Sequence, residues 1–249
     1  MSTTQVVIVG GHGKVALRLA KLLANTNKHS VTSIVRNEDH VPDLKAVSSA
    51  IHPLVLSLED GPVSEFAKAF TGKDVVVFAA GSGGKGGVEG LVKIDYEGAL
   101  KVFDAIEAVE GNKPRLVLVS AVDSRDTDGS IPSHYSEVDI ETSKQMRVSI
   151  GKYMEMKYLA DKNLSKRTTF KWSIIRPGFY DDEPGTGKAT IGRTHIAPSI
   201  SRDDVALALS ILIDRPDAAG LAVDMVGGDT SITEGLDAFI ARGETDFLG

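Results

Sequence analysis

The sequence contains no cysteine, which excludes disulfide bonds, thiolate metal ligands and a cysteine nucleophile. It also lacks an apolar run near the ~18 residues that a membrane-spanning helix needs. Positive charge is in the minority, since 28 Lys and Arg residues face 34 Asp and Glu, for a net charge of −6. That balance argues against nucleic acid or an anionic membrane as a partner. The first five residues lack the basic start of a secretory signal, so a cytoplasmic location is the default expectation.

Short apolar runs, rich in β-branched residues, recur along the 249-residue chain. They cover residues 6–9, 31–35, 54–56, 75–80, 116–119, 172–175 and 221–226. Such runs suit strands that are buried on both faces of a parallel sheet. Between several of them, apolar residues recur at helical spacing, within 15–23, 91–106, 153–159 and 205–212. Ser201, followed by acidic residues, predicts the N-cap of the last of these helices.

This alternation predicts an α/β fold with a doubly wound, mostly parallel sheet. No linker rich in Pro, Gly or Ser divides the chain, so residues 1–249 are expected to form a single domain. Three irregular segments, 81–90, 122–141 and 179–198, follow the fourth, fifth and sixth predicted strands. They lie at the edge where such sheets bind ligands, and we expect them to form the substrate region. A disordered insertion is the alternative for 122–141.

A glycine-rich loop, Gly10-Gly11-His12-Gly13-Lys14-Val15-Ala16, joins the first predicted strand to the first predicted helix. Glycines let the chain turn tightly and bring backbone N–H groups against a pyrophosphate, which the helix N-terminus also attracts. Small Ala16 allows the helix to pack closely on the strand. The position of the loop favours a dinucleotide site over an ordinary tight turn. For His12, we expect the backbone to matter rather than the ring.

The residues after the second strand bear on which dinucleotide binds. Arg36 comes first, and its guanidinium suits the 2′-phosphate of NADP. Glu38 and Asp39 could instead hold the 2′-hydroxyl of NAD if the strand ended later, and a solvated surface arginine is a further alternative. The pattern favours NADP over NAD.

Tyr153 and Lys157 stand at i and i+4 on one face of a predicted helix. A lysine beside a tyrosine is expected to lower the pKa of the phenol, which would then exchange protons nearer neutral pH. Ser120, at the carboxyl end of the fifth strand, would point into the same cleft and could polarise a carbonyl. Ser124 is a rival hydroxyl for that role.

The glycine-rich loop, Ser120 and the Tyr153/Lys157 pair together resemble the short-chain dehydrogenase/reductase superfamily. Five further segments resemble an atypical, extended-like branch of it, which includes NmrA-like and flavin-reductase-like proteins. They are residues 77–81, 93–98, 174–179, 182–188 and 201–206. Within the second, Asp95 stands at the position of the usual active-site Asn. The resemblance runs from about residue 5 to residue 228.

The resemblance implies an NAD(P)-binding Rossmann fold with bound NADP(H). It places the following residues at the cofactor: Gly10, Gly11, His12, Gly13, Lys14 and Val15 at the pyrophosphate, Arg36 and Asn37 at the adenosine ribose phosphate, Ser57 and Leu58 at the adenine, Ala79, Ala80, Gly81 and Asp95 beside the ribose and pyrophosphate, Lys157 at the nicotinamide ribose, and Pro177, Gly178 and Phe179 over the nicotinamide.

It further implies an NADP(H)-dependent oxidoreductase acting on a small carbonyl or related acceptor, with Ser120, Tyr153 and Lys157 as catalytic residues. Two alternatives stay open. One is a redox-sensing regulator of the NmrA type, which binds NADP(H) and a protein partner without turnover. The other is an NAD(P)-dependent epimerase or dehydratase, for which the chain from Phe179 onward is short.

The remaining polar residues suggest no further chemistry. The six histidines show no i, i+4 pairing with carboxylates, so no metal site is expected. Residues 81–87 lack the spacing of a Walker loop and are expected to form a flexible flap over the cofactor. Acidic and basic residues between 123 and 128, Asp123 and Arg125 among them, are expected to form a solvated loop.

Overall fold

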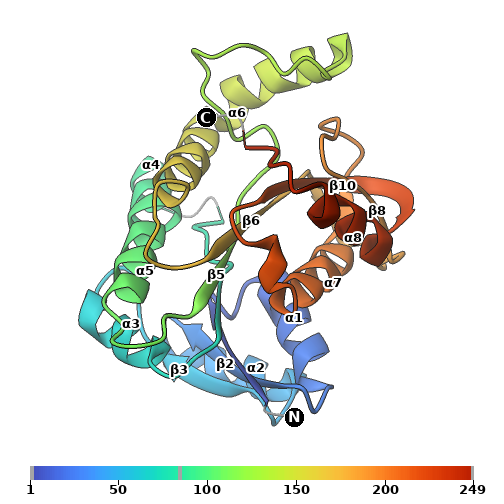
Figure 1. Ribbon diagram of the computed structural model, residues 1–249. Helices are drawn as coiled ribbons and strands as arrows, with labels where there is room; N and C mark the ends of the chain where they lie inside the picture. The colour runs from blue at the N-terminus through green and yellow to red at the C-terminus, as the bar shows by residue number, and fades with distance from the viewer. Residues whose placement is uncertain (1–2, 84–85, 248–249) are drawn as a thin grey trace.

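Eight strands form the central sheet, in the order β3-β2-β1-β4-β5-β6-β10-β8 (Figure 1). The computed structural model describes residues 3–83 and 86–247. The strands are β1 (Thr4–Val9), β2 (His29–Val35), β3 (His52–Val55), β4 (Val75–Phe78), β5 (Arg115–Val119), β6 (Trp172–Pro177), β8 (Lys188–Ile191) and β10 (Ala222–Ser231). All pair in parallel except β8, which runs antiparallel to β10. The predicted single α/β domain with a doubly wound, mostly parallel sheet is therefore confirmed.

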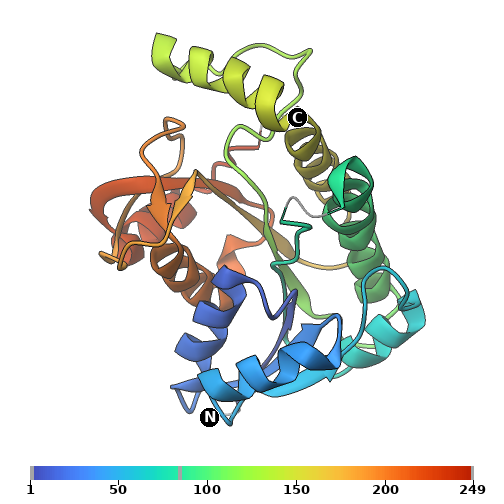
Figure 2. The same ribbon diagram turned by 180° about the vertical axis from the view of Figure 1, so that it is seen from behind.

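Helices cover both faces of this sheet (Figures 1 and 2). One face carries α1 (Lys14–Ala24), α2 (Val41–Val47), α7 (Arg202–Ile213) and α8 (Ile232–Arg242), and the other carries α3 (Val63–Phe70), α5 (Gly98–Glu107) and the second half of α6 (Glu137–Leu164). Shorter elements are η1 (Glu38–His40), α4 (Gly87–Gly90), the π-helical η2 (Leu91–Glu97), η3 (Pro216–Ala218), and the paired β7 (Tyr180–Asp181) and β9 (Ile200–Ser201). The buried side chains of each layer meet the apolar strands, which makes two hydrophobic cores, one per face.

The longest helix, α6, has 28 residues and bends at Ile150, where φ is −133° and ψ is 24°. Its first half, residues 137–149, extends away from the sheet (Figure 1, top). Asp139 ties this arm to the chain after β8, since it accepts hydrogen bonds from His195 Nδ1 over 2.6 Å and Ile196 N over 2.9 Å. Among the described residues, no helix is both long and apolar enough to cross a membrane.

Two of the segments predicted to be irregular contain regular structure. Helix α6 begins at Glu137, inside 122–141, because Ser136 and Asp139 form a reciprocal capping box that starts it. Strands β7 and β8 lie inside 179–198, where they are short and partly exposed. In the first segment, 81–90, the structure describes all but Gly84 and Lys85. The predicted N-cap at Ser201 is confirmed, since its side chain accepts a hydrogen bond from Asp203 N over 3.2 Å.

The loops after β1 and β4 meet where the connections reverse direction along the sheet. Gly10, directly after β1, has φ of +83°. A Cβ atom there would lie 2.5 Å from the Cα of Ala80, which follows β4. Only glycine allows this approach. In such folds, a ligand usually binds at this reversal, in a crevice at the carboxyl edge of the sheet.

The Gly10→Ala variant is expected to lower the free energy of unfolding by roughly 2–4 kcal/mol, because it adds both left-handed strain and steric overlap. Gly72 is the matched control, since its φ is +70° but a Cβ there would meet nothing within 4 Å. Gly72→Ala is expected to cost only about 1 kcal/mol. Urea denaturation measures both, and equal losses would contradict the overlap with Ala80.

Candidate active site

The predicted phosphate loop, residues 10–15, presents the first turn of α1 to the crevice. The amides of Gly11 and Gly13 are used within the fold, donating to Ile34 O over 2.8 Å and to Gly10 O over 2.9 Å. Gly13 is the N-cap of α1 and has no side chain to cap it, and no acidic residue lies in the first turn. Gly13 and Lys14 are exposed. The free first-turn amides can therefore receive an anion.

Near Arg36 and Asn37, where the adenosine ribose phosphate is expected, lies a ring pair that the sequence did not reveal. The imidazoles of His12 and His40 stack in parallel with centroids 3.9 Å apart. His12 Nε2 also lies 2.7 Å from Asp43 Oδ2, so the ring, and not only the backbone, has a defined place. Burial lowers the pKa of His40, and the charges of His12 and Arg36 lower it further. His12 and His40 are 28 positions apart, and no local pattern links them.

Arg36 and Asn37 follow β2 as predicted, next to this ring pair in the chain. Arg36 is exposed. Two polar atoms, Asn37 Oδ1 and His40 Nδ1, are buried without a hydrogen-bond partner among the described residues. Buried polar groups are normally hydrogen-bonded, so unpaired atoms at one place indicate a site for a polar ligand. Beyond β3, Ser57 Oγ donates to Asp60 Oδ2 over 3.1 Å, which holds the turn that contains Leu58.

Asp95 connects the loop after β4 to α6. It is buried in η2, and its Oδ2 accepts a hydrogen bond from Ser82 N over 3.0 Å. A Cβ on Gly81 would lie 3.1 Å from Asp95 Oδ1. The same Oδ1 lies 3.7 Å from Lys157 Nζ. Of the residues expected beside the cofactor, Asp95 thus lies next to both Gly81 and Lys157.

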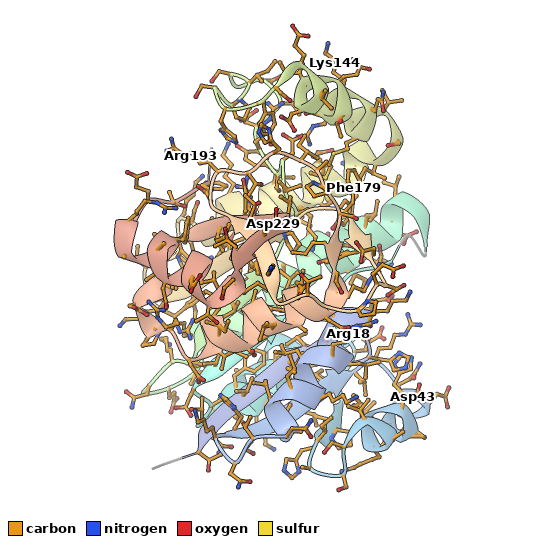
Figure 3. All side chains as sticks on the ribbon, turned by 90° about the vertical axis from the view of Figure 1, so that its right-hand side faces the viewer. Arg18, Asp43, Lys144, Phe179, Arg193 and Asp229 are labelled. Carbon is orange, nitrogen blue, oxygen red and sulfur yellow. The ribbon has the colours of Figure 1, made fainter. Side chains whose placement is uncertain are left out.

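A cavity of about 130 Å³ lies where the ends of β5 and β6 meet α6. It is lined by Ser120, Ala121, Val122, Met146, Ile150, Tyr153, Met154, Pro177, Gly178, Phe179 and Tyr180. Five residues of the predicted site are among them: Ser120, Tyr153, Pro177, Gly178 and Phe179. Phe179 is 45% exposed, and in Figure 3 it lies below Lys144 of the α6 arm and above Arg18 of α1.

Lys157 is anchored away from the phenol of Tyr153. Its Nζ donates to Val119 O over 3.1 Å and lies 5.7 Å from the centroid of the Tyr153 ring. Burial raises the pKa of Tyr153 above its usual value, and the carboxylates of Asp95 and Asp161 raise it further. The expectation that Lys157 lowers this pKa is wrong in this structure, because burial of the phenol and the nearby carboxylates of Asp95 and Asp161 all raise it.

Ser120 is held from behind by a carboxylate that the sequence did not single out. Ser120 Oγ donates to Asp161 Oδ2 over 2.8 Å, and both residues are buried. Asp161 lies one helical turn beyond Lys157, a spacing that could have indicated it. The rival hydroxyl, Ser124, is fully buried, and it is not among the residues that line the cavity.

Residues 123–128 form a buried ion cluster at their start, and not the solvated loop that was expected. Asp123 is fully buried with φ of +61°. Its Oδ1 accepts from Arg125 Nε over 2.8 Å, and its Oδ2 accepts from Ser143 Oγ over 2.7 Å and Arg147 Nη2 over 2.9 Å. Ser143 and Arg147 belong to the α6 arm, so Asp123 fastens the arm over the cavity. Within 3–83 and 86–247, no three His, Asp or Glu residues are grouped to hold a metal ion.

A second buried ion pair joins β6 to β10. Arg176, on β6, is 2% exposed, and its Nε lies 2.8 Å from Asp224 Oδ1 on β10. Burial raises the pKa of Asp224 to about 7, although the charge of Arg176 opposes the rise. Together with the ion cluster at Asp123, this pair gives the interior near the candidate site several charged side chains.

The sequence matches a known protein family. A family model described as NAD(P)H-binding matches residues 10–216, which is most of the chain. The chain belongs to this NAD(P)H-binding family. The resemblance to the atypical short-chain dehydrogenase/reductase branch is also confirmed, since the similar solved structures include oxidoreductases and epimerase-like proteins.

Full-length relatives share this organisation. A UPF0659 protein of Schizosaccharomyces pombe is 38% identical over 247 residues, which cover 98% of each chain. The solved structure of a Bacillus halodurans protein, described as a candidate NAD-dependent epimerase/dehydratase, is 33% identical with a TM-score of 0.77 and covers 94% of this chain and 99% of that chain. The oxidoreductase ylbE of Lactococcus lactis is 26% identical with a TM-score of 0.79, over 96% and 97% of the two chains.

Replacing Asp123 by Asn is expected to lower the free energy of unfolding by roughly 2–4 kcal/mol, because it leaves two guanidinium groups without their carboxylate. Asn tolerates the positive φ, so the change isolates the charge. Urea denaturation gives the loss, and hydrogen exchange should quicken in residues 137–149. Asp128→Asn, at an exposed position, should change stability by less than about 0.5 kcal/mol. Equal effects of the two variants would contradict the clamp.

Proposed function

We propose that this protein is an NADP(H)-dependent oxidoreductase that acts on a small carbonyl compound or related acceptor. The observation that carries the proposal is the shared cavity: the hydroxyl-bearing residues Ser120 and Tyr153 line one 130 Å³ space together with Pro177 and Gly178. Lys157 is fixed directly beside it by Val119 O. A hydroxyl pair and a buried cation at the end of a cofactor crevice suit reduction of a polarised double bond.

The residues along the crevice fit a dinucleotide. The uncapped first turn of α1 suits a pyrophosphate. Ser82 Oγ, Asn37 Oδ1 and His40 Nδ1 are buried polar atoms without partners among the described residues, and they leave hydrogen-bonding capacity for ribose and phosphate oxygens. Arg36 and the imidazole pair favour a 2′-phosphate, and hence NADP over NAD. When bound, the nicotinamide supplies or accepts the hydride.

Three side chains, Tyr153, Lys157 and Ser120, then orient the acceptor and the proton at its oxygen. Because the pKa of Tyr153 is raised, the phenol keeps its proton near neutral pH and can donate a hydrogen bond to the acceptor oxygen. Lys157 is held by Val119 O and Asp95, within reach of the nicotinamide ribose as the family resemblance implies. Ser120 provides the second hydroxyl at that oxygen.

The size and lining of the cavity favour a small and largely uncharged acceptor. Its 130 Å³ is close to the roughly 150 Å³ of an apolar cavity that binds benzene. Apolar side chains of Val122, Met146, Ile150 and Met154 contribute much of its wall. A nucleotide sugar needs far more room. The epimerase description of the Bacillus halodurans relative nevertheless makes an epimerase or dehydratase the second candidate.

Nucleotide titration by thermal shift or fluorescence, with NADP⁺, NADPH, NAD⁺ and NADH side by side, tests the cofactor assignment. Arg36→Ala is expected to weaken NADPH binding by roughly 10- to 100-fold, because a charge-assisted contact to the 2′-phosphate is lost. NADH binding should change by no more than about twofold. Lys28→Ala, an exposed cation at the opposite edge of the sheet, is the control. Equal weakening of NADH and NADPH would contradict the assignment.

Turnover of NADPH with a panel of small aldehydes and ketones tests the reaction. Tyr153→Phe is expected to lower kcat by roughly 10²-fold or more, because it removes a hydrogen-bond donor at the acceptor oxygen, while the Kd for NADPH is unchanged. Tyr158→Phe, on the same helix but bonded to Asp126 over 3.1 Å, should retain kcat. Binding without any turnover would favour a regulator, and nucleotide retained through gel filtration without net oxidation would favour an epimerase.

A further inference from the structure

Asp161, the carboxylate that accepts the Ser120 hydroxyl, has one oxygen atom that is available to bind a proton. Tyr153, Lys157 and Asp161 recur every four residues on one face of α6, and Asp161 is fully buried. Its Oδ2 accepts the Ser120 hydroxyl over 2.8 Å. Its Oδ1 is buried without a hydrogen-bond partner among the described residues. A carboxyl group with one free oxygen can take up a proton without breaking an existing bond.

Protonation of Asp161 changes what Ser120 offers to the cavity. When Asp161 is a carboxylate, the Ser120 proton points toward it and only the serine lone pairs face an acceptor. When Asp161 is protonated, it can donate to Ser120 Oγ, and the serine proton is free to reach an acceptor oxygen. The ability of Ser120 to polarise a carbonyl therefore depends on the state of Asp161.

We propose that Asp161 is a positioning residue that stores a proton and recharges Ser120, so that the two together supply the proton of carbonyl reduction. This inference rests on the proposed oxidoreductase function. As the carbonyl carbon accepts the hydride of the reduced nicotinamide, the carbonyl oxygen takes the Ser120 proton. Ser120 Oγ takes the Asp161 proton in turn. Asp161 is left as a carboxylate and regains a proton along the same route from water, once the alcohol has left.

The charges around Asp161 suit this role. Lys157 and Tyr153 face it from α6, Arg176 from β6 and Asp224 from β10. Burial raises the pKa of Asp161 to about 6, although Arg176, the Ser120 hydroxyl, Lys157 and the Ser124 hydroxyl oppose the rise. A carboxyl group in this range exchanges protons near neutral pH far more readily than the Tyr153 phenol, whose pKa is raised.

Carboxyl titration in the nucleotide-free protein tests the proton store. Carbon-13 NMR of labelled aspartate should show a group with a midpoint near 6 that disappears in Asp161→Asn. Ser120→Ala should raise that midpoint, because the carboxylate loses a hydrogen bond. Ser173→Ala, which removes a buried hydroxyl bonded to Ala218 O over 2.8 Å, should leave it unchanged. A midpoint near 4, or one that Ser120→Ala does not move, would overturn the proposal even if Asp161→Asn fails to fold.

The pH profile of NADPH-dependent reduction, measured with the acceptor panel, tests the transfer. In the wild type, kcat should fall about tenfold per pH unit above about 6, as Asp161 loses its proton. Asp161→Asn should be slower and lack this limb, and Tyr153→Phe and Ser173→Ala should keep it. Two results would overturn the proton transfer through Ser120 but not the oxidoreductase function. One is that the fall of kcat above about pH 6 persists in Asp161→Asn. The other is that this fall vanishes in Ser124→Ala but not in Ser120→Ala. No turnover by the wild type overturns the oxidoreductase function and the proton transfer with it, and leaves the titration result intact.

Discussion

At the switch point between β1 and β4, the backbone of Gly10 approaches that of Ala80 so closely that no side chain fits between them. The contact fixes the loop after β1 against the loop after β4. The next residue along that second loop, Gly81, lies against Asp95, which in turn lies 3.7 Å from the ammonium of Lys157. The predicted phosphate loop and the helix that carries Tyr153 and Lys157 are therefore placed relative to one another by a short series of direct contacts.

Much of the fold could be predicted from the sequence, because buried parallel strands have continuous β-branched runs. All seven predicted strands lie in the sheet, and β8 is the eighth. Strand β8 was missed because it is an edge strand of only four residues, too short for its alternation of polar and apolar residues to stand out from a loop. The start of α6 was missed because its arm packs little against the sheet and so lacks an apolar stripe, although the capping box at Ser136 was visible.

The candidate site also has features that the sequence could predict and features that it could not. Residues at the carboxyl ends of strands, such as Ser120 and Gly178, could be placed because parallel strands end at one edge. Contacts between positions far apart in sequence could not, and these include the stacking of His12 on His40 and the bond from Ser120 to Asp161. The predicted effect on the pKa of Tyr153 was wrong because that argument left out burial, the largest cause of the rise, and the carboxylates of Asp95 and Asp161.

The bend at Ile150 gives one helix two separate tasks. Before it, Met146 and Ile150 contribute to the wall of the cavity, while Asp123 fastens that half from below. After it, Tyr153 faces the cavity, and the downstream turns pack into the second core. Substitutions before the bend can therefore reshape one wall of the cavity, while Tyr153 keeps its place on the half of the helix that packs on the sheet.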